Sequence, residues 1–310
     1  MLVLGEKYNF TQLELEELQK KFTSIIILPY KDIEQENVLQ QLQKAFEKHE
    51  EQLLVLNTEM RVGEKVIQYL TKLQFQKHKK LEVIRIEHFM EQYLYKCYIP
   101  DDNTELNFLE DIKPYSRWQL IQKRFVDFFG IIVIILFSIP IIFYAYFRIQ
   151  KESPGSFIFK QSRIGMNRKE FICYKLRTMY LDAEKNGAQF ASQNDKRIFP
   201  FGEIMRKMRI DELPQVVNIL KGEMHLIGPR PERAVWTDKF EEEIPYYNER
   251  HLVRPGITGW AQVMYPYGSN SEDARQKLMY DLYYIKHWSL WLECNVIIKT
   301  MPVILGKEGI

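Results

Sequence analysis

An adjacent pair of acids, Asp211 and Glu212, is the strongest chemical signal in the sequence, within RKMRIDELPQVVNILKGEMHLIGPRPE. The surrounding region is basic: the stretch 148–233 holds 17 Lys or Arg residues against 10 Asp or Glu. Nearby cations lower the pKa of a carboxyl group and keep it ionised. An ionised carboxylate suits a nucleophile or a metal ligand, and the excess of cations suits an anionic substrate. The region therefore predicts chemistry on a phosphate.

Two arginines are candidates for holding that phosphate. Arg206 precedes Asp211 by about one helical turn, and the guanidinium fork matches phosphate oxygens. Arg230 lies in a Gly-Pro-Arg-Pro turn, where the prolines restrict the backbone on both sides of it. Mg²⁺ prefers oxygen ligands and can bridge carboxylate and phosphate, so Asp211 and Glu212 are also candidate metal ligands. The alternative is that the two acids form salt bridges on the surface of a basic helix.

A long uncharged segment, 128–147, reads FFGIIVIILFSIPIIFYAYF. As a helix it is about 30 Å long, enough to cross the hydrocarbon core of a bilayer. Pro140 interrupts helical hydrogen bonding, and Ser138 offers a hydroxyl to the freed backbone. Both flanks carry Lys and Arg, which favours keeping both ends in the cytoplasm. We therefore expect a re-entrant helical hairpin over 123–151 that breaks near Ser138 and Pro140; a Pro-kinked transmembrane helix is the alternative.

The segments around the hairpin differ in pattern. In 1–113, the apolar runs SIIILP, QLLVLN and LEVIRI alternate with helix-like windows, which predicts a small parallel α/β domain. It lacks a glycine-rich phosphate motif, so we expect a scaffold or regulatory role. Residues 114–122 are a predicted linker, and 152–310 a mostly helical α+β catalytic domain. The three cysteines lack metal or disulfide spacing, and no secretory signal opens the chain, so we expect a reducing compartment.

Several motifs, in this order, resemble the bacterial sugar transferases, the monotopic phosphoglycosyltransferases. They are KRFVDFFG, FICYKLRTM, MRKMRIDELPQVVNILKGEMHLIGPRPE, VRPGITGWAQV and YDLYYIKHWSLWLE. The resemblance covers about 120–305. It implies transfer of a sugar-1-phosphate from a UDP-sugar to undecaprenyl phosphate, with release of UMP, at the cytoplasmic face of the bacterial inner membrane. It also implies that 1–113 correspond to the α/β domain that larger members carry before the catalytic part.

The resemblance assigns roles to particular residues. It implies that Asp211 is the nucleophile that forms a covalent phosphosugar intermediate, that Glu212 is its partner, and that Mg²⁺ assists. The remaining residues that it places along the site are Lys175, Arg206, Arg230, Arg254 and Asp281. The hairpin of the family commonly breaks at a Ser-Pro pair, whereas here Ile139 separates the two residues.

Other functions are possible from the residues alone. The chain could be a non-catalytic adaptor that anchors a polysaccharide assembly system to the bilayer. A nucleic-acid partner is not expected, because carboxylates lie within the basic region and no nucleic-acid-binding motif occurs. The sequence is also compatible with a homodimer that forms through the N-terminal domain or the C-terminal helices.

Overall fold

The computed structural model describes residues 1–30, 35–48, 53–59, 62–75, 81–103, 106–183, 185, 195–265, 268 and 270–305. The chain forms two compact units, Met1–Tyr98 and Ile99–Ile310. The first is α/β with a parallel sheet, and the second is mostly helical with two small sheets.

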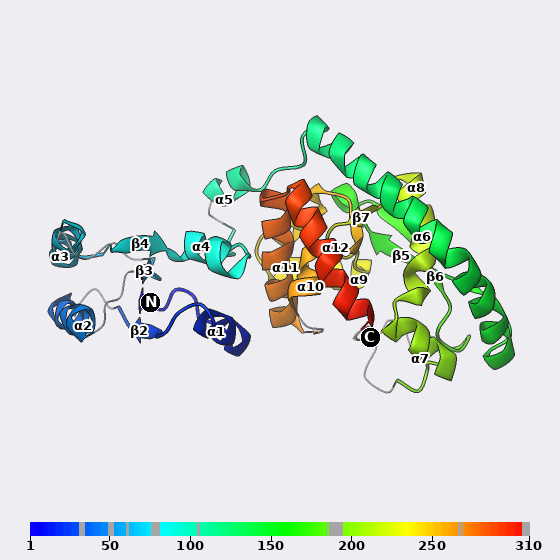
Figure 1. Ribbon diagram of the computed structural model, residues 1–310, viewed down its shortest axis with the longest axis horizontal. Coiled ribbons are helices and arrows are strands. Elements are labelled where there is room, and N and C mark those ends of the chain that lie inside the picture. Colours follow the sequence, from blue (N-terminus) through cyan, green and yellow to red (C-terminus); the bar gives the residue numbers. More distant parts are fainter. Residues whose placement is uncertain are drawn as a thin grey trace. The chain divides into compact units, whose positions relative to one another are not determined.

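The N-terminal unit alternates strands and helices along the chain (Figure 1). Its elements are β1 (Leu2–Leu4), α1 (Gln12–Gln19), β2 (Ile26–Leu28), α2 (Gln35–Lys48), β3 (Leu53–Leu56), α3 (Glu64–Gln74), β4 (Glu82–Arg85), α4 (Ile86–Phe89) and the π-helical turn η2 (Met90–Leu94). All strand pairs are parallel, in the order β2-β1-β3-β4. The predicted parallel α/β layer is therefore confirmed, and β2, β3 and β4 are the three apolar runs identified in the sequence.

Strand β1 is one of the two inner strands of the sheet, and the sequence pattern did not reveal it. It has only three residues, too few for a recognisable strand pattern, yet all three are fully buried between β2 and β3. Leu2, Leu4 and Leu54 point to one face, where apolar residues of α2 and α3 cover them. Val3 alternates to the other face. The core of this unit thus depends on the first residues of the chain.

The C-terminal unit contains the acid pair and the long apolar segment. Its elements are α5 (Leu106–Asp111), α6 (Arg117–Glu152), β5 (Ile158–Ile164), η3 (Met166–Arg168), β6 (Glu170–Leu176), α7 (Pro200–Lys207), η4 (Ile210–Gln215), α8 (Val216–Lys221), β7 (His225–Ile227), α9 (Ala234–Glu243), η5 (Tyr247–Leu252), β8 (Gly256–Thr258), α10 (Trp260–Met264), α11 (Ser271–Lys286) and α12 (Leu290–Leu305). Strands β5 and β6 form an antiparallel hairpin, and β7 pairs with β8 in parallel.

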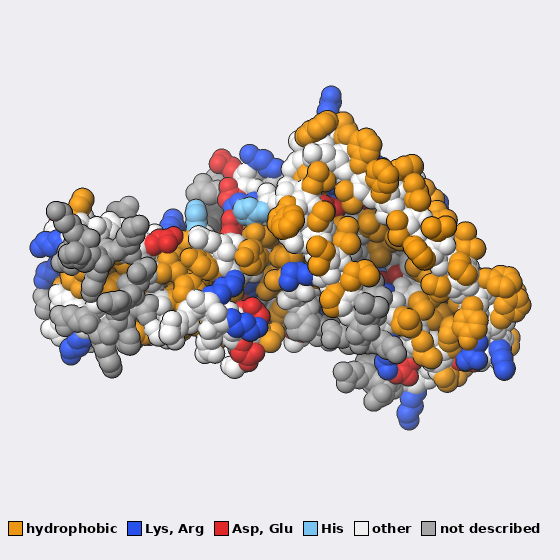
Figure 2. All heavy atoms as spheres, viewed as in Figure 1, with side chains coloured by type: hydrophobic (Ala, Val, Ile, Leu, Met, Phe, Trp, Pro, Cys, Tyr) orange, Lys and Arg blue, Asp and Glu red, His pale blue; other side chains and the backbone are white. Residues whose placement is uncertain are grey.

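Helix α6 is long and apolar enough to cross a membrane, as judged by its length and composition. Only one stripe along it is buried: Lys123, Asp127, Ile131, Ser138, Ala145 and Ile149. Large hydrophobic side chains are exposed over the rest of its surface, and Figure 2 shows them along its length. A helix with this exposure needs an apolar environment on its outer side, which fits a membrane-embedded segment.

The expected break near Ser138 and Pro140 is not observed, because α6 continues as one helix through both residues (Figure 1). The stripe explains this difference. Ile131, before the proline, packs in a cluster with Phe171 of β6. Ala145, after the proline, packs in another cluster with Leu176 of the same strand. Packing on both sides therefore outweighs the one hydrogen bond that a proline removes. Helix α6 also begins at Arg117, so most of the predicted linker is helical.

A buried ion pair joins the start of α6 to α12. Lys123, which is 1% exposed, donates to Glu293 Oε1 over 2.8 Å and to the carbonyl of Ile227 over 2.9 Å. Trp288 Nε1 donates to the same oxygen of Glu293 over 2.7 Å, and the hydroxyl of Tyr284 contacts it as well. A buried charge is tolerated only when it is paired and hydrogen-bonded, so this cluster fixes the entry of α6 onto the unit.

Removal of the cation should therefore be costly. We expect Lys123→Met to lower the free energy of unfolding by about 3 kcal/mol, because Glu293 would stay buried without a counter-charge. All five tryptophans lie in the C-terminal unit, so the tryptophan fluorescence of the detergent-solubilised protein reports its unfolding in urea. The control is Lys207→Met, whose exposed pair with Glu203 contributes less than about 0.5 kcal/mol. Equal losses in the two variants would contradict the role of the buried pair.

Candidate functional site

The acid pair lies on a short helical turn that begins with a strained residue. Helix α7 ends at Lys207, and Arg209 then adopts a left-handed conformation with φ 57°, which is uncommon for a residue other than glycine. This reversal starts η4, which packs against β6 and turns Asp211 and Glu212 inward. The acids are 7% and 4% exposed, so the surface alternative is wrong. The prediction that Arg206 lies one turn before the acid pair on the same helix is also wrong, because α7 ends at Lys207 and the chain changes direction at Arg209.

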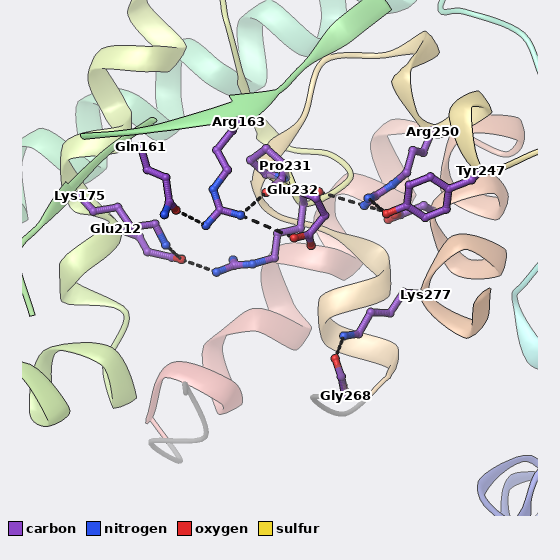
Figure 3. Close-up of polar contacts among 12 residues, drawn as sticks. Gln161, Arg163, Lys175, Glu212, Pro231, Glu232, Tyr247, Arg250, Gly268 and Lys277 are labelled. Atoms are coloured by element: carbon purple, nitrogen blue, oxygen red, sulfur yellow. Dashed lines mark hydrogen bonds and ion pairs between the residues drawn. The ribbon is translucent and has the colours of Figure 1, made fainter. Parts of the chain in front are cut away.

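Glu212 is held by cations from three segments. Its Oε1 atom accepts from Lys175 Nζ of β6 over 3.0 Å (Figure 3). The same atom accepts from a guanidinium nitrogen of Arg230 over 2.8 Å. Its Oε2 atom lies 3.5 Å from Arg209. Burial by itself would raise the pKa of Glu212, but Arg230, Lys175 and Arg209 outweigh it and hold that pKa well below its usual range. Glu212 is therefore ionised at neutral pH and serves as the counter-charge of the cluster.

Asp211 is in the opposite situation. Among the residues that the structure describes, its carboxylate has no hydrogen bond and no ion pair. Burial raises the pKa of Asp211, and the charges of Lys175, Arg206 and Arg209 offset only part of that effect. The expectation that the basic region lowers the pKa of both acids is thus correct for Glu212 but wrong for Asp211, whose pKa is raised. Burial without a bonded partner is the physical reason.

A second ion pair, between Arg250 and Asp281, holds the backbone of Arg230 in place. Arg250, which is 6% exposed, donates to the backbone carbonyl of Arg230 over 2.9 Å and to Asp281 over 2.8 Å. Its other terminal nitrogen donates to the hydroxyl of Tyr247 over 2.8 Å (Figure 3). Asp281 therefore reaches the acid pair only indirectly, through Arg250 and the backbone of Arg230.

The turn that carries Arg230 requires a close approach between two backbone segments. A Cβ atom on Gly228 would lie 2.7 Å from the carbonyl oxygen of Arg254 and 2.9 Å from the amide nitrogen of Gly256. The amide of Gly256 in turn donates to the carbonyl of Pro229 over 2.9 Å. This contact and the restricted prolines hold the backbone, so that the guanidinium of Arg230 is presented from a rigid turn.

Two other residues predicted along the site, Arg206 and Arg254, do not form ion pairs with Asp211 or Glu212 among the described contacts. Arg206 donates to Thr178 Oγ1 over 2.9 Å, and its charge acts on Asp211. Arg254 is not among the partners of the acid pair; the charges that act on it come from Arg124 and Asp127 of α6. Of the residues predicted along the site, the structure thus brings Lys175 and Arg230 into contact with the acid pair, but not Arg254.

Sequence reasoning missed Arg163 and Arg250. Arg163 lies on β5 opposite Phe171, and it shares with Lys175 the face of the β5–β6 hairpin. It donates to the carbonyl of Pro231 over 3.1 Å and lies 3.6 Å from Glu232 (Figure 3). Strand alternation could have identified Arg163, because it and Lys175 occupy positions of the same parity across the pair. Arg250 had no such signal, since it lies in η5, which is too short to show a periodic pattern.

The described residues contain no group of three or more His, Cys, Asp or Glu side chains that could enclose a metal ion. Mg²⁺, however, is commonly bound by one or two carboxylates together with substrate phosphates. Asp211 offers both of its oxygens, and Glu212 Oε2 has only the long 3.5 Å contact with Arg209. These two side chains fit that mode of binding, whereas a site made of protein ligands alone does not fit.

The contrast between the neighbouring acids predicts opposite effects on stability. In the metal-free protein, Glu212→Gln should lower the free energy of unfolding by about 3 kcal/mol at pH 7, because Arg230 and Lys175 lose their counter-charge. Asp211→Asn should raise it by up to about 1 kcal/mol, because an unpaired buried charge is removed. Urea unfolding followed by tryptophan fluorescence measures both.

The two effects should also differ in their pH dependence. The pKa of Glu212 is lowered by folding, so its stabilisation is complete above about pH 4.3 and is lost as the pH falls through the folded value. The pKa of Asp211 is raised, so its penalty is absent below about pH 3.9 and is complete once the pH exceeds the folded value. Equal losses of stability in the two variants at pH 7 would contradict this assignment.

Comparisons with known proteins agree with the position of this site. A sequence model described as bacterial sugar transferase matches residues 118–307, which include the acid pair. The UDP-N-acetylgalactosamine-undecaprenyl-phosphate N-acetylgalactosaminephosphotransferase of Aeromonas hydrophila is 44% identical over 208 residues, 67% of this chain and 49% of that protein. The UDP-glucose:undecaprenyl-phosphate glucose-1-phosphate transferase of Xanthomonas campestris pv. campestris is 41% identical over 163 residues, 52% of this chain and 34% of that protein.

A shorter relative is matched over most of its length. The UDP-glucose:undecaprenyl-phosphate glucose-1-phosphate transferase of Caulobacter vibrioides is 36% identical over 210 residues, 67% of this chain and 79% of that protein. The chain spans half or less of the length of the first two relatives. The family match covers more than half of the chain and contains α6, the acid pair and the Arg230 turn. The chain therefore belongs to the bacterial sugar transferase family.

Proposed function

We propose that this chain transfers a sugar-1-phosphate from a UDP-sugar to undecaprenyl phosphate and releases UMP. The observation that carries the proposal is the site of this family member: a buried, unpaired Asp211 beside Glu212, which is bound to Lys175 and Arg230. The relatives named above use N-acetylgalactosamine or glucose donors, so the proposal names the class of UDP-sugar. Such a reaction starts the assembly of a glycan on a lipid carrier.

In the first step, an oxygen of Asp211 attacks the phosphorus that carries the sugar. A bond forms between that oxygen and the phosphorus, and the bond from the phosphorus to the bridging oxygen breaks. The bridging oxygen leaves with the electron pair as part of UMP, and a phosphosugar-aspartate remains. Because Asp211 has no hydrogen bond within the described part of the chain, it loses no protein partner when it attacks.

In the second step, a phosphate oxygen of undecaprenyl phosphate attacks the same phosphorus. The bond to Asp211 breaks, its carboxylate is regenerated, and a polyprenyl diphosphate sugar is formed. Both nucleophiles are anions, so neither step requires a general base. The site must instead reduce repulsion between anions, which requires positive groups held in place beforehand.

Lys175 and Arg230 are placed for this task. Their nitrogens share Glu212 Oε1, so one carboxylate fixes two cations beside Asp211. Arg250 holds the backbone of Arg230, which limits its movement when a diphosphate binds. When Mg²⁺ is bound, it supplies charge neutralisation at the phosphate oxygens. Asp211 and Glu212 Oε2 are the protein atoms that would hold it.

Helix α6 supports a monotopic attachment to the cytoplasmic face of the inner membrane. Near its start, Asp127 accepts from the amide of Leu226 over 2.8 Å. At its end, Glu152 accepts from the amide of Phe201 over 2.8 Å. Since both ends contact the same compact unit, a crossing of the whole bilayer would have to separate one end from it. We therefore propose that α6 enters one leaflet only, either along the surface or, after bending at Pro140, as the re-entrant hairpin.

The first experiment measures UMP release from a panel of UDP-sugars, with and without undecaprenyl phosphate and Mg²⁺. We expect one or a few donors to give UMP that depends on the lipid and the metal. Asp211→Asn should reduce that rate by at least about 10³-fold, because the nucleophile is lost while the fold is kept. Lys207→Met is the control, since its pair with Glu203 is exposed. Folded wild type that releases no UMP from any donor would favour the non-catalytic adaptor.

A second experiment tests the attachment to the membrane. The exposed Cys294 is replaced by Ser, while Cys97 and Cys173 are buried and remain. Single cysteines are then introduced by Arg117→Cys and Lys151→Cys, near the two ends of α6. In sealed inverted vesicles, a membrane-impermeant maleimide should label both positions from the cytoplasmic side. Labelling of the two positions from opposite sides would show a transmembrane helix and contradict the monotopic proposal.

A further inference from the structure

Two arginines without acidic partners lie at the start of the apolar part of α6. Arg124 is an exposed residue of α6, and Arg254 is half-buried just before β8. Within the described residues, neither guanidinium has a hydrogen bond or an ion pair. Partial burial and the charge of Arg124 lower the pKa of Arg254, which indicates that the two cations lie within electrostatic reach of each other. Such a pair repels itself unless an anion lies nearby.

The backbone contacts around β7 bring the two arginines together. Asp127, one turn after Arg124 on the same helix, accepts from the amide of Leu226 over 2.8 Å. The amide of His225, the neighbouring residue, donates over 2.8 Å to the carbonyl of Pro255, which follows Arg254. Strand β7 thus lies between the start of α6 and the segment that carries Arg254.

The nearest carboxylate does not neutralise the pair. Asp127 accepts through Oδ1 from the amide of Leu226 and contacts His225 Nδ1 through Oδ2, at 2.6 Å. Both of its oxygens are therefore engaged by β7, and it forms no ion pair with Arg124 or Arg254 in the described structure. Arg124 NH2 lies 3.0 Å from the position that a Cβ on Gly222 would take, so a glycine there leaves room for the guanidinium. The guanidinium groups of both arginines therefore remain available to bind an oxyanion.

The position of the pair indicates where that oxyanion comes from. Arg124 is followed directly by exposed Phe125, Phe128 and Phe129, where the uncharged part of α6 begins. Arginine at the end of a membrane segment lies at the level of the lipid headgroups, where phosphates are the abundant anions. His225, the first residue of β7, precedes Arg230 by five residues, so their Cα atoms are at most about 18 Å apart. The chain therefore leads directly from the strand beside the pair to the turn that contacts Glu212.

We propose that Arg124 and Arg254 form a second phosphate site, separate from the Asp211–Glu212 cluster, which binds the phosphate of a membrane lipid. The chemistry fits either the phosphomonoester of the lipid acceptor or the phosphodiester of an anionic phospholipid. That the bound lipid is the acceptor rests on the proposed function, whereas the inference that the two arginines bind a lipid phosphate does not. An acceptor held here would present its phosphate on the side of β7 that leads to the catalytic turn.

The test measures binding and needs no donor or turnover. The full chain is mixed with vesicles of neutral phosphatidylcholine, alone or with a few mole per cent of either phosphatidylglycerol or undecaprenyl phosphate, and bound protein is sedimented. The double variant Arg124→Gln/Arg254→Gln should lose at least about tenfold in binding to vesicles that contain the preferred phosphate lipid. Its binding to neutral vesicles should equal that of the wild type, since the large apolar side chains exposed on α6 are unchanged. The matched control, Arg117→Gln, removes an exposed cation from the same end of α6 and should cost less than about threefold.

The vesicle types distinguish the two lipid sources. A loss confined to undecaprenyl phosphate identifies the acceptor, and a loss on both anionic lipids identifies a general headgroup site. Wild-type binding by the double variant on both anionic lipids, or an equal loss in Arg117→Gln, would overturn the proposal. If the Gln variants fail to fold, Arg124→Lys and Arg254→Lys keep the charge but remove the fork. These should still weaken binding, and equality with the wild type would overturn the proposal as well.

Discussion

The buried carboxylate of Glu212 is the interaction on which the site depends. Its Oε1 atom binds Lys175 from the β5–β6 hairpin and Arg230 from the turn after β7, so one charge joins elements that are far apart in the chain. Two cations this close would repel each other without it. Because Glu212 is 4% exposed, solvent screens the interaction little, and loss of the carboxylate would leave two charges uncompensated. The fold and the arrangement of cations are thus linked through one residue.

Asp211 illustrates the opposite arrangement. The same turn that satisfies Glu212 leaves its neighbour buried and without a partner, which raises its pKa and makes its ionised form costly. The turn itself begins with Arg209 in a left-handed conformation, a second local cost. Natural proteins tolerate such costs where function requires them, and an unpaired carboxylate beside fixed cations is suited to attack on a phosphate. The adjacent acids therefore have different roles because their surroundings differ.

Helix α6 links this site to a lipid environment. Its buried stripe holds it against the C-terminal unit on both sides of Pro140, and the rest of its surface presents large apolar side chains. Lys123, at its start, is fully enclosed by Glu293 and its neighbours, which makes the orientation of the helix relative to the unit well defined. The reaction that we propose needs such an element, because the reacting group of a lipid phosphate remains at the headgroup level while its tail remains in the bilayer.

The sequence by itself determined the parts that depend on local chemistry. The acid pair in a basic region, the rigid turn around Arg230, the apolar segment and the apolar strands β2, β3 and β4 were all evident from residue types and spacing. Only the tertiary structure decided which charges meet. It paired Glu212 with Lys175, separated Arg254 from the acids, and revealed Arg250 behind Arg230. These contacts join segments distant in sequence, and no local pattern encodes them.

Tertiary packing also produced three features that local sequence preferences did not predict. Pro140 predicts a break, but clusters on both sides of it keep α6 continuous. A basic neighbourhood predicts a lowered pKa for Asp211, but burial without a partner raises that pKa. Strand β1 has too few residues to be recognised, yet it is one of the two inner strands of its sheet. In each case the deciding quantity is burial, which depends on the whole fold, whereas the sequence alone determines only which residues are available to be buried.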